Sequence, residues 1–271
     1  RNIGESTAQY PYSETGFTTS PKKFSGYRLN SGVYNMYNNR EMRFYASIGF
    51  SECFWPMTST STTGNYNQTV TYYFDSPDGK QSNVIDYPLT GYVIKKFINP
   101  TDAWAGTNAK RLTKAYPVIR YADILLMYAE ALNHLTTTHT VQLDGETYTL
   151  SRDVDEMRKA FNQVRHRAGL PGMSVTEAAD VDEVQKLIEQ ERMVELLFEN
   201  ERYYDVRRWG KYEASESVTM TGMNMDGTKA TYYQRTVPNS NRVGSRVVNR
   251  KMMFMPIPNS EIRKLPAMSQ N

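Results

Sequence analysis

The chain has 271 residues, with 32 Lys and Arg against 29 Asp and Glu, and its net charge of +3 is spread over an interleaved pattern. Without a clustered basic block, nucleic acid is excluded as an expected partner. The single cysteine, Cys53, excludes an internal disulfide framework and a four-cysteine zinc site, and no run approaches the roughly 20 apolar residues of a membrane-spanning helix.

Composition divides the chain into three parts that we expect to form one unit. Residues 1–115 are rich in Tyr, Asn, Ser, Thr and Gly and have few helical periods. Residues 116–210 have the periodicity of long helices, and residues 211–271 return to turns and short strands. The pattern predicts a mainly α fold with long loops and short β-hairpins.

The loop-rich part carries aromatic rings among polar residues. Trp55 precedes Pro56 and a Ser/Thr/Gly/Asn tract, and Trp104 lies between turn formers in NPTDAWAGTN. Flat rings beside amides suit sugar recognition, because a ring covers the apolar face of a pyranose while amides bind its hydroxyls. The candidate ligand-binding residues are Trp55, Tyr66, Tyr72, Tyr73, Trp104, Asn65 and Asn67, with Asn108 as a further amide.

The alternative is that these aromatics hold long loops onto the helices. Tyr72 and Tyr73 are adjacent, so in an extended segment they point to opposite sides and at least one is expected to face a core.

The helical part begins with a predicted helix just after Pro117. Apolar residues at three- and four-residue steps place one face toward the core. That predicted core face consists of Tyr121, Ile124, Leu125, Tyr128, Leu132 and Leu135.

A tight hairpin and a second helix follow. Asp144-Gly145 lies between two alternating runs, which is typical of a two-residue hairpin turn. The second helix then directs Met157 and Phe161 inward and ends at Gly169, where a left-handed cap fits.

A third helix is expected from near Asp182 toward Tyr204, and Gly210 ends either that helix or a short successor. Helix pairs joined by short turns indicate a helical-repeat stack, although no strict 34-residue period is present.

Three glutamates, Glu191, Glu195 and Glu199, stand four residues apart on one face of the third helix. Paired carboxylates can act as acid and base in glycoside hydrolysis. Arginines lie within a turn or two, however, and arginine-paired carboxylates keep a low pKa and stabilise helices. We therefore interpret the cluster as structural; the nearby arginines are Arg192, Arg202, Arg207 and Arg208.

Signatures of metal and nucleotide chemistry are missing from the sequence. His134, His139 and His166 have no metal-ligand spacing, and the chain has no GxGxxG, no GxxxxGK[ST] and no GxSxG motif. No cofactor and no catalytic metal are expected. A structural calcium ion held by Asp75 and Asp78 stays open, although their spacing matches no dedicated calcium loop.

Four ordered segments, RYADILLMYAEALN, FNQVRHRAGLP, ERMVELLFENERYYDVRRWG and FMPIPNSEIRKLPAMSQN, resemble the C-terminal half of the SusD/RagB family of outer-membrane nutrient-binding lipoproteins. NNREMRFYASIGF and TGYVIKKF resemble that family's middle region. The resemblance covers about residues 38–271. It implies a mainly α, tetratricopeptide-like helical core with no catalysis, and an N-terminal half that is absent from this sequence.

By the same resemblance, the protein captures oligosaccharides at the cell surface and passes them to a TonB-dependent, SusC-like transporter. It implies an outer-membrane location, anchored by lipid on a cysteine that is not present in this chain. Trp55 occupies the kind of loop position that carries sugar-stacking aromatics in relatives. Two alternatives stay open: a RagB-like peptide-binding uptake protein, and a glycosidase that uses Glu191 or Glu195.

Overall fold

The structure is a computed structural model that describes residues 15–24, 27–55, 68–102, 110–238 and 246–265, together with 267 and 269. Its α-helices are α1 Met42–Ser47, α2 Tyr121–His134, α3 Val154–Arg167, α4 Val175–Ala179, α5 Val181–Glu195, α6 Glu201–Arg208, α7 Tyr212–Glu216 and α8 Asn259–Ile262. Short 3-10 turns occupy Asn35–Tyr37 (η1) and Arg250–Met253 (η3).

The strands are short and pair antiparallel, two by two. The described pairs are β1 Lys22–Phe24 with β2 Tyr27–Leu29, β3 Ile48–Phe50 with β4 Tyr92–Ile94, β5 His139–Leu143 with β6 Glu146–Leu150, and β7 Gly222–Met223 with β8 Arg235–Thr236.

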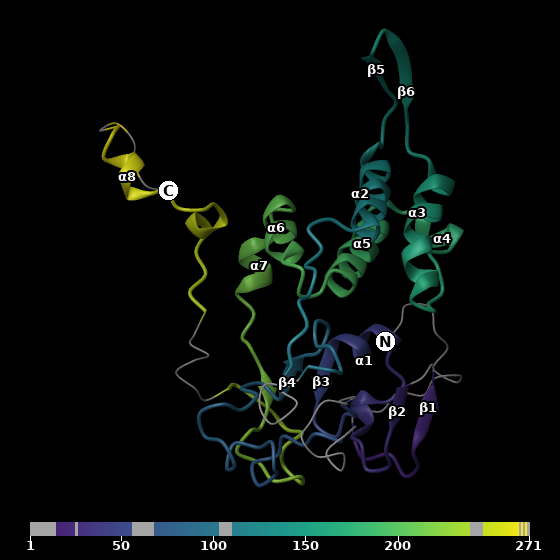
Figure 1. The fold of residues 1–271 in the computed structure, drawn as a ribbon. Coiled ribbons are helices and arrows are strands. Elements are labelled where there is room, and N and C mark those ends of the chain that lie inside the picture. Colours follow the sequence, from purple (N-terminus) through teal and green to yellow (C-terminus); the bar gives the residue numbers. More distant parts are fainter. Residues whose placement is uncertain are drawn as a thin grey trace.

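The helical core is built from α2, α3 and α5, which lie side by side, with α4 against α3 and α5 (Figure 1). Leu126, Met157 and Ile188, one from each of the three long helices, are fully buried in one apolar cluster. This arrangement confirms the mainly α fold and its helical-repeat type of core.

The ends of α3 follow the signals in the sequence. The Asp153 carboxylate accepts a hydrogen bond from the Glu156 N–H at 2.9 Å, which caps the first turn. At the other end Gly169 is left-handed, with φ of 73°. The N–H of Leu170 reaches back to the Arg165 carbonyl at 3.0 Å, which satisfies a carbonyl that the helix leaves open.

The third predicted helix is divided in two. Helix α5 ends at Glu195, and Phe198 and Asn200 adopt left-handed φ angles of 64° and 67° that no continuous helix accommodates. The chain restarts as α6, and Gly210, with φ of 66°, follows that short successor.

The predicted core face of α2 is right for its leucines and wrong for the rest. Leu132 is buried in the helical core, and Leu125 and Leu135 pack against it. Tyr121, Ile124 and Tyr128 are 69%, 44% and 46% exposed, whereas Leu126 and Ala129 are fully buried. Polar side chains orient this helix, because those on the inner face bind partners on other elements. The buried polar residues are Asp123, which pairs with Arg192; Glu130, which binds Arg208 and Trp209; and Asn133, which binds Arg152 and the Val181 carbonyl.

A second core lies under the loop-rich part and combines segments that are distant in the sequence. Leu29 and Phe50 are fully buried there beside Tyr232, which follows the helical part by more than twenty residues. Residues after α7 therefore return to pack on the first part of the chain (Figure 1).

The β5–β6 hairpin projects away from the helices (Figure 1). Its turn residues Asp144 and Gly145 have φ angles of 52° and 83°, as a two-residue hairpin turn requires. All ten strand residues are exposed. The hairpin signal in the sequence is confirmed.

Candidate functional site

Trp55 precedes the polar tract of residues 56–67, which lies outside the described residues. Its N–H donates to the Gln68 carbonyl at 2.8 Å, and Val70 N–H donates to the Cys53 carbonyl at 3.1 Å. The backbone is thus paired on both sides of residues 56–67. These hydrogen bonds hold the backbone of Trp55, a few residues after β3, in a defined position.

The Trp55 ring rests on a glycine. A Cβ added to Gly49 would lie 2.7 Å from Trp55 Cζ3 and 2.6 Å from Val93 Cγ2, so the ring and Val93 meet where Gly49 has no side chain. Lys95 Nζ lies 5.7 Å from the ring centroid, within the range of a cation–π contact. The ring is only half-buried, which leaves part of it accessible.

Tyr72 and Tyr73 belong to the core instead of an open platform. They are 5% and 8% exposed, and the Tyr73 ring meets Tyr232 edge to face with centroids 5.6 Å apart. Burial raises the pKa of Tyr72 well above its ordinary value. Both rings pack inward because the backbone bends here: Tyr72 N–H donates to Ser51 Oγ, and Ser76 N–H to the Tyr73 carbonyl. At this burial little of either ring is open for stacking, although Tyr72 also lines an open cleft on this part of the chain. The binding role of both residues stays a prediction.

The other predicted ligand-binding residues lie outside the described residues. This holds for Asn65, Tyr66, Asn67, Trp104 and Asn108, so their part in ligand binding stays a prediction.

The three glutamates of α5 and the turn after it are buried in ion pairs. Glu191 accepts from Arg43 at 2.6 Å and from Arg165 at 3.2 Å. Glu195 accepts from Arg43 and Arg120, each at 2.9 Å, and also pairs with Arg167.

Glu199 completes this cluster. It pairs with Arg120 at 2.6 Å and with Lys96 at 2.5 Å. Arg43 and Lys96 come from the loop-rich part, so the cluster joins that part to the helices.

These carboxylates are ion-paired, as expected, but their partners differ from the arginines that lie nearby in sequence. Arg192 pairs with Asp123 at 2.7 Å and Asp205 at 2.8 Å, and Arg208 binds Glu130. Arg43 lies 148 residues from Glu191 along the chain, and no short-range pattern signals that contact.

The charges around Glu195 suit an ion-pairing residue better than a general acid. Burial alone would raise its pKa, but hydrogen bonds from Arg43 and Arg120, with the charge of Arg167, outweigh burial and hold the pKa below its usual value. A carboxylate held ionised in this way has no proton to give to a leaving group at neutral pH.

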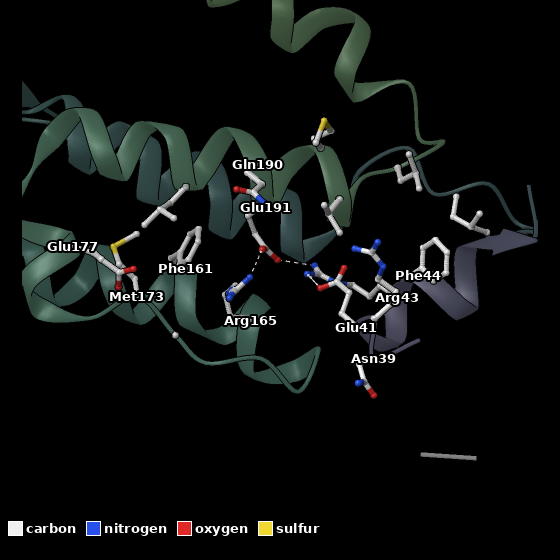
Figure 2. Close-up of a pocket in the computed structure, with 17 residues that line it drawn as sticks. Asn39, Glu41, Arg43, Phe44, Phe161, Arg165, Met173, Glu177, Gln190 and Glu191 are labelled. Atoms are coloured by element: carbon white, nitrogen blue, oxygen red, sulfur yellow. Dashed lines mark hydrogen bonds and ion pairs between the residues drawn. The ribbon is translucent and has the colours of Figure 1, made fainter. Parts of the chain in front are cut away.

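An apolar cavity of about 370 Å³ opens between α1 and the helices α3 and α5, as Figure 2 shows. Phe44, Phe161 and Met173 line it, and its charged lining includes Glu191 with its ion-pair partners Arg43 and Arg165. Sequence reasoning missed this cavity because its walls come from segments more than 100 residues apart.

Among the described residues, no three His, Cys, Asp or Glu side chains come together as a metal site. A structural calcium ion held by Asp75 and Asp78 stays a prediction. No helix in the described part of the chain is both long and apolar enough to cross a bilayer.

Solved structures share this fold. BT4246 matches with a TM-score of 0.70 and 22% identity over 93% of this chain and 39% of its own. A SusD-like protein from Bacteroides fragilis matches with a TM-score of 0.64 and 29% identity over 87% of this chain and 39% of its own. A SusD-like carbohydrate-binding protein from the same species matches with 0.57 and 25%, over 84% and 41%.

The chain therefore spans about two-fifths of the length of the solved structures that it resembles. No curated protein matches it in sequence. The sequence profile of the SusD family matches residues 5–271, almost the whole chain. With the helical core described above, this match shows that the chain belongs to the SusD family.

Proposed function

We propose that this protein captures oligosaccharides at the cell surface and performs no chemistry on them. The observation that carries the proposal is the family match together with a solved relative described as carbohydrate-binding. The position of Trp55 supports it, because a half-buried ring held over Gly49 is rigid enough to stack on a sugar without large loss of side-chain freedom.

Titration with neutral and charged polysaccharides, followed by tryptophan fluorescence, tests this proposal. Saturable binding with a dissociation constant of about micromolar to millimolar is expected. Trp55→Ala should abolish the response while far-UV circular dichroism stays unchanged. If no carbohydrate binds, or if Trp55→Ala binds like the wild type, glycan capture through this ring is wrong.

The proposed partner is a SusC-like, TonB-dependent transporter in the outer membrane, to which the captured sugar is passed. The proposed location is the cell surface, through a lipid on a cysteine outside these 271 residues. Affinity purification of the full-length gene product should retain the transporter, and protease treatment of intact cells should digest the protein. Resistance to the protease would contradict the surface location.

An N-terminal half is a further proposed partner, since the chain spans only two-fifths of its solved relatives. The exposed side chains of Tyr121, Ile124 and Tyr128 on α2 support a helix packing there. Amide hydrogen exchange of α2 should slow when the remaining part is joined to the chain. Unchanged exchange would exclude that docking face.

Peptide uptake is the second candidate function, and the cavity of Figure 2 is the observation that favours it. Apolar walls suit a peptide side chain better than a hydroxyl-covered sugar. Met193 is 44% exposed and lines the cavity, so Met193→Glu should weaken binding of Leu- or Phe-containing oligopeptides. Lys186→Glu, on an exposed part of the same helix, is the matched control.

Absence of catalysis is tested at Glu191 and Glu195. Incubation with the bound polysaccharide should release no reducing ends. Detectable turnover that disappears in Glu195→Gln would support the glycosidase alternative instead.

A further inference from the structure

An open cleft of about 580 Å³ lies on the loop-rich part, apart from the cavity of Figure 2. Its walls are the turns around residues 77–78 and 83–89, and Val93 of β4 also lines it. The volume falls in the ~300–1,000 Å³ range of small-molecule sites. The lining combines Tyr87 and the largely buried Tyr72 with Asp78, Asn83, Asp86 and Pro88, so aromatic rings and several polar groups face one space.

Tyr87 is held in place as one wall of this cleft. It packs against the apolar core of the loop-rich part and is only half-buried. Lys80 Nζ lies 5.6 Å from the ring centroid and is itself fixed by Asp226 at 2.5 Å. Lys80 lines a separate, smaller hollow that Tyr87 also borders. The Tyr87 ring thus has the ion-paired Lys80 on one side and the open cleft on another.

The polar groups are oriented by the backbone. Asp78 Oδ2 accepts from the Thr71 N–H at 3.2 Å, which leaves Oδ1 as an acceptor. Asn83 Oδ1 accepts from the N–H groups of Ile85 and Asp86 at 3.1 and 2.9 Å, which leaves the Asn83 amide N–H₂ as a donor. A sugar hydroxyl both donates and accepts, so this pair of groups complements it.

The charge of the cleft selects among sugars. Two carboxylates, Asp78 and Asp86, line it, and no Lys, Arg or His is among the described residues of its lining. Uronate and sulfate groups would be repelled by these carboxylates. Val93 lines the cleft and also lies beside Gly49, the residue on which the Trp55 ring packs.

We propose that this cleft is a binding site for a neutral oligosaccharide, with Tyr87 stacking on a sugar ring and Asp78 and Asn83 hydrogen-bonding its hydroxyls. The inference rests on the proposed function and adds to it a second stacking residue and the class of glycan.

Affinity electrophoresis of the 271-residue chain in gels containing soluble starch, xyloglucan, arabinoxylan or laminarin, against polygalacturonate and heparin, identifies the bound glycan. Calorimetry with that glycan then measures each variant. Tyr87→Ala should weaken binding about tenfold, whereas Tyr87→Phe, which keeps the ring, should stay within about twofold. Tyr148→Ala removes a ring that is 46% exposed on the hairpin and is the matched control.

The outcomes separate the cleft from the proposed function. If a glycan binds, and Trp55→Ala abolishes binding while folded Tyr87→Ala does not change it, the cleft is not the binding site, and the proposal of glycan capture stands. If only polygalacturonate or heparin binds, the proposal that the ligand is a neutral glycan is wrong. If none of the six polysaccharides binds, both proposals fail. Asp78→Asn, which keeps the shape, should weaken binding severalfold, and an unchanged affinity would remove Asp78 from the site.

Discussion

Replacement of Arg192 by methionine should be among the most destabilising single changes in the helical core. The Arg192 side chain is 2% exposed and pairs with Asp123 and Asp205, whose side chains are 10% and 3% exposed. Methionine fills a similar volume but leaves both carboxylates without this partner. Asp205 keeps Arg208 at 2.8 Å, whereas Asp123 keeps no other ion pair among the described residues.

Breaking a buried ion pair from one side costs about 3–5 kcal/mol, because the charge left behind has lost both water and its partner. That is a large part of the ~5–15 kcal/mol that stabilises a typical domain. For a chain of this size, with a urea dependence near ~3 kcal/mol per molar, the unfolding midpoint should fall by about 1 to 2 M.

Urea unfolding followed by far-UV circular dichroism measures this shift. Lys186→Met is the matched control, because Lys186 and Glu183 form an exposed pair at 3.3 Å that should contribute less than about 1 kcal/mol. The triple variant Arg192→Met, Asp123→Leu, Asp205→Leu should recover much of the loss, since no buried carboxylate remains there. A midpoint for Arg192→Met equal to that of Lys186→Met would refute the reasoning.

Three further predictions concern other sites. Glu195→Gln should lower the melting temperature at neutral pH, and the gap to the wild type should close as the pH falls below about 4.5, because the depressed pKa of Glu195 makes its contribution present above the unfolded value and lost in acid; a gap independent of pH would contradict this. Cys53, fully buried and with its pKa raised by that burial, should react with a thiol reagent only after denaturation; prompt labelling of the native chain would contradict its burial. Gly49→Ala should displace the Trp55 ring and lower the free energy of unfolding by about 1–3 kcal/mol. Unaltered tryptophan fluorescence and stability would show that the contact between Trp55 and Gly49 is not tight.

Local signals in the sequence located the elements well. Asp153 and Gly169 mark the ends of α3, and Asp144-Gly145 marks the hairpin, because caps and tight turns depend on one or two residues and their own backbone. The division between α5 and α6 was harder to place. It depends on left-handed φ angles at Phe198 and Asn200, which non-glycine residues seldom adopt.

Long-range packing could not be predicted in the same way. Periodicity alone predicted that Tyr121 and Tyr128 of α2 face the core, but both are exposed. Asp123 and Glu130 are buried instead, because they pair with Arg192 and Arg208 on other helices. The candidate site shows the same limit. Sequence reasoning singled out Trp55 but not Tyr87, whose cleft exists only because two turns meet in space.

The hairpin between α2 and α3 has a practical consequence. The two helices pack directly against each other, and a connection of ~2–8 residues usually suffices for such neighbours. The strand residues of this hairpin are all exposed. A peptide tag or a small fluorescent group inserted between Asp144 and Gly145 should therefore leave the helical core intact, and would report on living cells which way this end of the molecule faces.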